Sequence, residues 1–208
     1  MYQPEPKRVK RVGVVGLGNT GQQWVALFQR CGLEVVGYDP GGLSFSPLTS
    51  EGTFTMAPDL ASTVAEVDFV QECGPPALIA KLQLLKWLDA VTPEGVIIAS
   101  STANCAMTTL QQDLVHPERC VVGHLWADNS AFVEVVGGQK TAPTAIDWVM
   151  AFYAVLGRQP LQINNESPGF LTSRLQGAVW REAVEVVAKG LTTVKEIDAV
   201  MTYGSTRR

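Results

Sequence analysis

Short apolar runs alternate with amphipathic segments along residues 11–163, and this alternation predicts the fold class. Runs rich in β-branched residues are typical of buried strands, whereas apolar positions three and four residues apart indicate helices. The expected strands are a run of valines leading into Gly16, a run ending at Asp39, and Phe69–Glu72, Val96–Ala99, Cys120–Gly123, Phe132–Val136 and Gln159–Ile163. Helices are expected up to Gly32, from Asp59, from Pro75 to Ala90, over Met107–Leu114 and over Thr144–Leu156, with a Gly-, Ser- and Pro-rich loop before Met56. Strands alternating with helices predict an α/β, Rossmann-type doubly wound, mainly parallel sheet.

The pattern changes near Glu166. From Pro168 an amphipathic helix is expected to run to Lys189 and stop at Gly190, and Thr193 with Glu196 predicts a capping box for one more helix. We therefore expect an N-terminal tail (1–10), a nucleotide-binding domain (11–166) and a short C-terminal helical segment (167–208). The apolar stripe of the long helix must be buried, which favours a homodimer formed through these helices.

Three glycines after the first strand predict a dinucleotide site. Gly16 allows a tight turn, Gly18 lets the backbone approach a pyrophosphate, and Gly21 lets the helix pack close to the sheet, while the helix N-terminus offers free N–H groups. Asp39 ends the second strand, where a carboxylate can bind the adenosine ribose and would repel a 2′-phosphate. The predicted cofactor is therefore NAD rather than NADP.

Composition excludes several function classes. The net charge is -4 and charged residues make up 17% of the chain, so no electrostatic footprint for nucleic acid exists. The 208 residues contain no apolar run long enough for a membrane span and no signal-peptide pattern, and we expect a cytoplasmic protein. The four cysteines lack metal-ligand spacing, so reduced structural thiols and no metal are expected.

Several segments, in order and spacing, resemble the 3-hydroxyacyl-CoA dehydrogenase superfamily, nearest the branch of L-gulonate 3-dehydrogenase (lambda-crystallin) and carnitine 3-dehydrogenase. The segments that carry the resemblance are residues 99–102 (ASST), 116–124 (HPERCVVGH), 133–138 (VEVVGG), 167–170 (SPGF), 174–176 (RLQ), 180–183 (WREA) and 196–198 (EID). The resemblance implies a nucleotide-binding domain followed by only the first helices of the family's second domain.

The resemblance also implies site residues. His124 and Glu134 stand where the family has a His–Glu dyad acting as general base: the imidazole takes a proton from a secondary alcohol, and the carboxylate fixes its tautomer. The cofactor-binding set is Gly16, Leu17, Gly18, Asn19, Thr20, Gly21, Asp39, Gly74, Pro75, Lys81 and Ser101. The candidate substrate contacts are Thr102, Asn104, Trp126, Asn129 and Ser173.

Departures from the family cluster on the substrate side. The family's catalytic serine falls on Ala103, its asparagine on Ser173, and the glutamate after the third strand on Pro76. The loop between His124 and Glu134 differs as well and is shorter. Losing one such donor typically costs on the order of 10²–10³ in rate. The sequence thus predicts a remodelled substrate pocket rather than one for standard 3-hydroxyacyl-CoA substrates.

Two functions remain open from the sequence. One is an NAD-dependent oxidoreductase that interconverts a hydroxy and a keto compound. The alternative is an NAD-binding protein that has lost dehydrogenase activity and serves as a sensor, scaffold or redox-neutral catalyst. The oxidoreductase is favoured, because His124 and Glu134 keep their register.

Overall fold

The computed structural model describes residues 2, 4–42, 52–126 and 131–204, and it divides into two compact units, Met1–Phe170 and Leu171–Arg208. The strands of the first unit are β1 (Arg11–Val15), β2 (Glu34–Tyr38), β3 (Phe54–Met56), β4 (Phe69–Glu72), β5 (Ile97–Ser100), β6 (Cys120–Leu125), β7 (Phe132–Gly137) and β8 (Gln159–Ile163). Its helices are α1 (Asn19–Arg30), α2 (Leu60–Val64), α3 (Leu78–Val91), α4 (Met107–Leu110) and α5 (Pro143–Val155), with 3₁₀ turns η1 (Pro6–Arg8) and η2 (Pro117–Arg119). The second unit holds α6 (Thr172–Ala188) and α7 (Val194–Tyr203).

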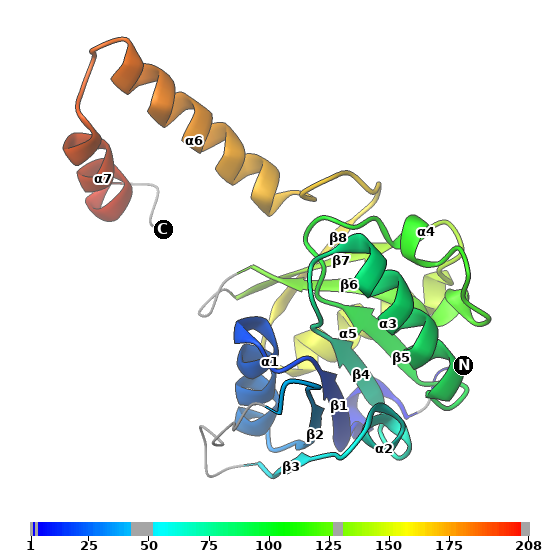
Figure 1. The fold of residues 1–208 in the computed structure, drawn as a ribbon. Coiled ribbons are helices and arrows are strands. Elements are labelled where there is room, and N and C mark those ends of the chain that lie inside the picture. The colour runs from blue at the N-terminus through cyan, green and yellow to red at the C-terminus, as the bar shows by residue number, and fades with distance from the viewer. Residues whose placement is uncertain (1, 3, 43–51, 127–130, 205–208) are drawn as a thin grey trace. The chain divides into compact units, whose positions relative to one another are not determined.

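One sheet forms the centre of the first unit, with the strand order β3-β2-β1-β4-β5-β6-β7-β8 (Figure 1). Neighbouring strands in the described part of the chain run parallel, except that β6 and β7 are antiparallel. The chain turns from one half of the sheet to the other between β1 and β4, and ligands of doubly wound sheets bind at such a switch point. The expected fold class is confirmed.

Helices cover both faces of the sheet because side chains alternate along each strand. Val14 lies in the cluster formed with α1 and α5, whereas Val15 lies in the cluster formed with α2, α3 and α4. The α1–α5 side is aromatic: the rings of Trp24 and Tyr153 stack with centroids 5.2 Å apart, next to Phe28. This packing holds α1 and α5 against the same face of the sheet.

The first unit differs from the sequence expectations in three local features. Pro75 and Pro76 precede α3 instead of lying in its first turn: Ala77 is the N-cap, and a residue before proline is driven out of the helical region. α4 ends at Leu110 rather than Leu114. The backbone hydrogen bonds after it, from Gln112 to Thr109 and from Leu114 to Gln111, join residues three apart, as in a 3₁₀ turn and not as in an α-helix. β3 was not predicted from the sequence. Residues 43–51 of the expected loop before it lie outside the described residues.

α6 begins at Thr172, four residues after the expected start at Pro168. Gly169 (φ 76°) and Phe170 (φ 43°) both adopt left-handed backbone conformations, which a right-handed helix does not accommodate. Phe170 is 2% exposed and packs into the core of the first unit. The segment before α6 therefore belongs to the nucleotide-binding unit.

The second unit is a pair of helices that bury none of their own residues. Gly190 (φ 68°) follows the end of α6 as expected, and the predicted capping box of α7 is confirmed by reciprocal bonds between Thr193 and Glu196. Apolar side chains of α6, including Leu175, Val179 and Trp180, are exposed. None of the helices in the described ranges is both long and apolar enough to cross a membrane.

Candidate functional site

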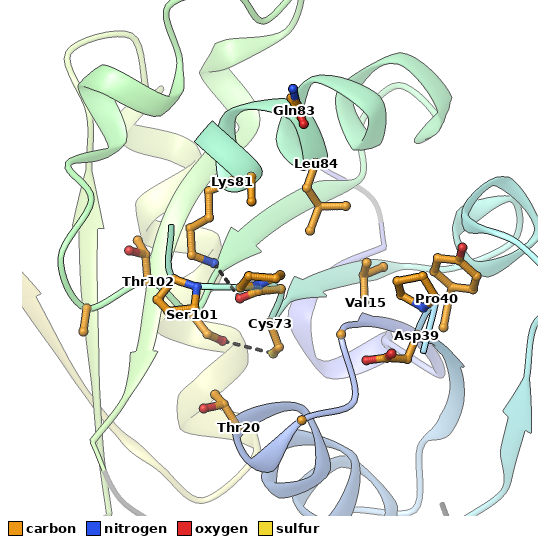
Figure 2. Close-up of a pocket in the computed structure, with 18 of the residues that line it drawn as sticks. Val15, Thr20, Asp39, Pro40, Cys73, Lys81, Gln83, Leu84, Ser101 and Thr102 are labelled. Carbon is orange, nitrogen blue, oxygen red and sulfur yellow. Dashed lines mark hydrogen bonds between the residues drawn. The ribbon is translucent and has the colours of Figure 1, made fainter. Parts of the chain in front are cut away.

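A cavity of about 1060 Å³ opens at the carboxyl ends of β1, β2, β4, β5 and β6 and continues along α3 (Figure 2). Strand order fixes the sequence of groups along it: Asp39 after β2, Gly16 after β1, Cys73 after β4, Ser101 after β5 and His124 in β6. Segments far apart in the chain thus meet in one crevice at the switch point of the sheet, where the glycine motif predicts the cofactor.

Each glycine of the motif fits the expected task. Gly16 has φ 92°, and a Cβ there would lie 2.6 Å from the carbonyl of Cys73. A Cβ on Gly21 would lie 1.8 Å from the carbonyl oxygen of Gly16, so only glycine lets α1 approach the turn this closely. Gly18 faces open space, and Asn19 and Thr20 of the first turn of α1 line the cavity. This cradle of N–H groups fits a pyrophosphate. Leu17, predicted in the same set, is fully buried and does not line the cavity.

Asp39 lies at the opposite end of the crevice from His124. Its carboxylate accepts hydrogen bonds from the backbone N–H of Leu17 (2.7 Å) and of Gly41 (2.8 Å), which fix its position above the glycine turn. Each carboxylate oxygen keeps a further lone pair for a ribose hydroxyl. The cavity is also lined by mostly apolar residues that the sequence analysis did not identify: Tyr38, Pro40, Leu60, Leu84 and Trp87.

Lys81 belongs to a buried ion pair beneath Gly74 and Pro75. Its ammonium donates to both carboxylate oxygens of Glu72 at 2.9 Å and to the Gly74 carbonyl at 3.3 Å. Glu72 also accepts from the Gly74 N–H and the Ser100 hydroxyl, both at 2.5 Å. Lys81 lines the cavity, yet only 2% of its surface is exposed. The pair holds the turn after β4 in the shape that the crevice requires.

His124 and Glu134 face each other across the antiparallel pair β6–β7. Their strands place them directly opposite, and Nδ1 of His124 lies 2.8 Å from Oε2 of Glu134. Glu134 is 1% exposed and does not line the cavity, whereas His124 does. The ring of Phe170 lies 6.3 Å from the imidazole. The carboxylate thus fixes one ring nitrogen, and the imidazole is the member of the pair that reaches the crevice.

The loop after β5, the strand that pairs with β6, supplies further polar groups to the cavity lining. Thr102 is buried, and its Oγ1 accepts from the backbone N–H of Cys105 (2.9 Å) and Asn104 (3.3 Å), which shapes the loop. Ala103 and Asn104 line the cavity, and the Asn104 side chain is exposed. The position predicted to correspond to the family's serine, Ala103, therefore presents a methyl group, and the amide of Asn104 follows it in the chain.

The other predicted substrate residues have different positions. Trp126 is half-buried just after β6 and is not among the residues that line the cavity. Asn129 lies outside the described residues. Ser173 lies in the first turn of α6, in the second unit. Pro76, which was predicted to stand in place of the family's glutamate and not to contact substrate, lines the cavity before α3.

All four cysteines are free thiols. Cys73, which the sequence did not mark as a site residue, lines the cavity with its Sγ 3.2 Å from the Ser101 hydroxyl (Figure 2). Burial raises the pKa of the Cys73 thiol to about 12, so the group stays protonated at neutral pH.

Comparison with known proteins identifies the class to which this fold and site belong. The model for the 3-hydroxyacyl-CoA dehydrogenase NAD-binding domain matches residues 46–167, and that for the 3-hydroxyacyl-CoA dehydrogenase C-terminal domain matches residues 169–207. The chain belongs to the 3-hydroxyacyl-CoA dehydrogenase family, and its first unit is an NAD-binding domain. The expected family and cofactor are confirmed.

Within this family the chain is similar to L-carnitine dehydrogenases. It is 41% identical to that of Streptomyces griseus over 96% of this chain and 66% of the relative, and 40% identical to that of Streptomyces coelicolor over 96% and 69%. The chain therefore spans about two thirds of the length of these relatives.

Solved structures show the same fold. A 5-formyl-3-hydroxy-2-methylpyridine 4-carboxylic acid 5-dehydrogenase, described as an NAD+-dependent dismutase, matches with a TM-score of 0.85 at 27% identity over 95% of this chain and 71% of its own. The (S)-3-hydroxybutyryl-CoA dehydrogenase of Ralstonia eutropha matches with a TM-score of 0.80 at 26% identity over 96% and 78%.

Proposed function

We propose that this protein is an NAD-dependent oxidoreductase that interconverts a hydroxy and a keto compound. The observation that carries the proposal is the His124–Glu134 pair, at 2.8 Å, placed so that only the imidazole enters the crevice that begins at the glycine cradle. NAD, when bound, supplies the hydride acceptor. His124 takes the hydroxyl proton on the ring nitrogen that does not face Glu134, and Glu134 stabilises the imidazolium that forms.

The residues beside His124 support a substrate other than a standard 3-hydroxyacyl-CoA. Ala103 offers no hydroxyl to the reacting oxygen, so this role falls to Asn104 or to the hydroxyl of Thr102. Similarity to L-carnitine dehydrogenases makes small hydroxy acids, L-carnitine among them, the first compounds to test.

The proposal is tested by following NADH formation with a panel of hydroxy compounds that includes L-carnitine, other 3-hydroxy acids and 3-hydroxybutyryl-CoA. Reduction of NAD by a non-CoA hydroxy acid is expected. NADH binding without turnover of any compound would instead favour the second candidate, an NAD-binding protein without dehydrogenase activity, for which the methyl group of Ala103 is the supporting observation.

The cofactor preference is expected to depend on Asp39. Asp39→Ala removes the carboxylate proposed to bind the ribose, and it also removes the acceptor of the Leu17 and Gly41 N–H groups. NADH binding should weaken by about tenfold, while NADPH binding should weaken less or improve, because the repulsion of a 2′-phosphate is lost. Dissociation constants from NADH and NADPH fluorescence titrations measure this. Equal affinity of the unchanged protein for both cofactors would contradict the assignment.

We further propose that the second unit forms a homodimer interface. Leu175, Val179 and Trp180 are 60%, 42% and 60% exposed, and α6 and α7 bury no residue of their own. An apolar helix face of this kind is stable when a partner covers it, and a second copy of the chain is the simplest partner.

Leu175→Asp is therefore expected to dissociate the dimer, because a carboxylate without a partner is costly to bury in an apolar interface. Sedimentation velocity at micromolar concentration should show a shift from dimer to monomer. Arg181→Asp also introduces a carboxylate at an exposed position of α6, but on the side of the helix away from Leu175 and Val179, and should leave the dimer intact. A wild-type protein that sediments as a monomer of 22.4 kDa would exclude the interface.

A further inference from the structure

Ser101 is the centre of a polar cluster formed with residues of α1, of β4 and of the turn after β4. Its Oγ lies 3.0 Å from Nε1 of Trp24 in α1, 2.8 Å from Nε2 of Gln71 in β4 and 3.2 Å from Sγ of Cys73. Trp24 and Gln71 are fully buried, whereas Ser101 is half-buried and lines the cavity. The hydroxyl therefore connects the core with the crevice.

The direction of the bond from Gln71 is determined by its surroundings. Nε2 of Gln71 also lies 3.4 Å from the carbonyl of Ala99 and 3.3 Å from that of Gly123, and carbonyl oxygens only accept. If the amide of Gln71 were flipped, its Oε1 would face the carbonyl oxygens of Ala99 and Gly123, and two acceptors cannot share a hydrogen bond. The hydroxyl of Tyr153 donates to Oε1 of Gln71 at 2.8 Å and holds the amide from its other end.

Gly123 makes room for this contact from Tyr153. A Cβ at Gly123 would lie 2.0 Å from the Tyr153 hydroxyl oxygen, so only a glycine in β6 lets that hydroxyl reach Gln71. The cluster thus extends from α5 through β4 to the cavity, and each of its members is held in place by an element of the core.

The two core donors occupy both lone pairs of the serine oxygen. An indole N–H can only donate, and the Gln71 amide donates in the orientation that the carbonyls impose. A serine hydroxyl has two acceptor lone pairs and one hydrogen, so Ser101 is left as a donor only. Its hydrogen has the weakly accepting sulfur of Cys73 as its partner within the protein, or a stronger acceptor in the crevice.

The place of Ser101 along the crevice indicates which half of the cofactor it meets. β5 lies between β4, whose turn adjoins the glycine cradle, and β6, which carries His124. Ser101 is therefore beyond the pyrophosphate cradle, on the side of the reacting ring. The oxygens of that half of NAD, the ribose hydroxyls and the carboxamide carbonyl, can all accept a hydrogen bond.

We propose that Trp24 and Gln71 are positioning residues that hold the Ser101 hydroxyl as an obligatory donor to an oxygen of the nicotinamide half of NAD. The inference rests on NAD binding in the crevice and not on the proposed dehydrogenase reaction. A test by binding alone therefore succeeds or fails independently of whether any hydroxy compound is turned over.

The test compares NADH with ADP, which lacks the nicotinamide half. Ser101→Ala should weaken NADH binding about five- to tenfold, the size of one net hydrogen bond. Trp24→Phe removes one donor and frees the hydroxyl to rotate, so it should weaken NADH binding about two- to fivefold. Neither change should alter ADP binding. The double variant should bind NADH as Ser101→Ala does, because Trp24 acts only through Ser101.

Trp148→Phe is the matched control. The indole of Trp148 likewise packs in the aromatic core, and its N–H donates to the Pro4 carbonyl at 2.9 Å, away from the cavity lining. This variant should leave NADH binding unchanged. Additive effects in the double variant, equal losses for NADH and ADP, or unchanged NADH binding in Ser101→Ala would each overturn the proposal. Thermal melting of every variant establishes that the binding values refer to folded protein.

Discussion

His124→Ala is expected to reduce NAD-linked turnover by about 10²–10⁴-fold, the usual contribution of a general base. The loss should appear in kcat, because the imidazole acts on the substrate proton as the hydride leaves. The dissociation constant of NADH should stay within about threefold, since a general base contributes to the reaction and not to holding the dinucleotide. Steady-state kinetics with the hydroxy compound found in the panel, together with NADH titrations, measure both quantities.

Two further variants distinguish a loss of catalysis from a non-specific effect of removing a histidine. Glu134→Gln should cost less than His124→Ala, because the imidazole remains and only its charged partner is lost. His116→Ala is the matched control: it is the other histidine of the chain, and it also faces a carboxylate, Glu118 at 3.5 Å, but away from the cavity lining. It should leave turnover unchanged. A substrate whose oxidation survives His124→Ala would place the chemistry on another residue.

Most helices and strands of the fold were predictable from sequence, whereas the start of α6 and the short strand β3 were not. The β-branched run before Gly16 and the glycine after α5 mark their elements because each residue is constrained locally. Nothing in the local sequence predicts the left-handed backbone at Phe170. Because of it, α6 begins at Thr172 and not at Pro168. β3 is only three residues long and pairs with β2 through a contact that local pattern does not encode.

The site shows the same division. Gly16 and Asp39 could be found because motif spacing places them at strand ends, which meet at one edge of a parallel sheet. His124 was identified through the resemblance to the 3-hydroxyacyl-CoA dehydrogenase family. The Trp24–Gln71–Ser101 cluster joins residues from three separate elements, and its polarity depends on two backbone carbonyls. Such a network follows from three-dimensional packing and leaves no spacing in the sequence.

Lys81 was predicted to contact the cofactor, but it also forms a buried ion pair with Glu72. The sequence predicts a cofactor contact, and the structure places its ammonium within 2.9 Å of both oxygens of Glu72, in a pair that is almost completely buried. Lys81→Met keeps an unbranched side chain only one heavy atom shorter and leaves the Glu72 carboxylate without its cation. Breaking a buried ion pair in this way typically costs about 3–5 kcal/mol.

We therefore expect Lys81→Met to lower the free energy of unfolding by about 3 kcal/mol, the lower end of that range, because Glu72 keeps the Gly74 and Ser100 donors. Urea unfolding monitored by circular dichroism measures the loss. Glu72→Gln combined with Lys81→Met should recover part of it, since no unpaired charge remains. Lys86→Met is the control, because Lys86 lines the same cavity from α3 but is exposed, and its loss should leave stability unchanged. If Lys81→Met keeps its stability and loses NADH affinity instead, the residue acts on the cofactor directly, and the ion pair with Glu72 is secondary.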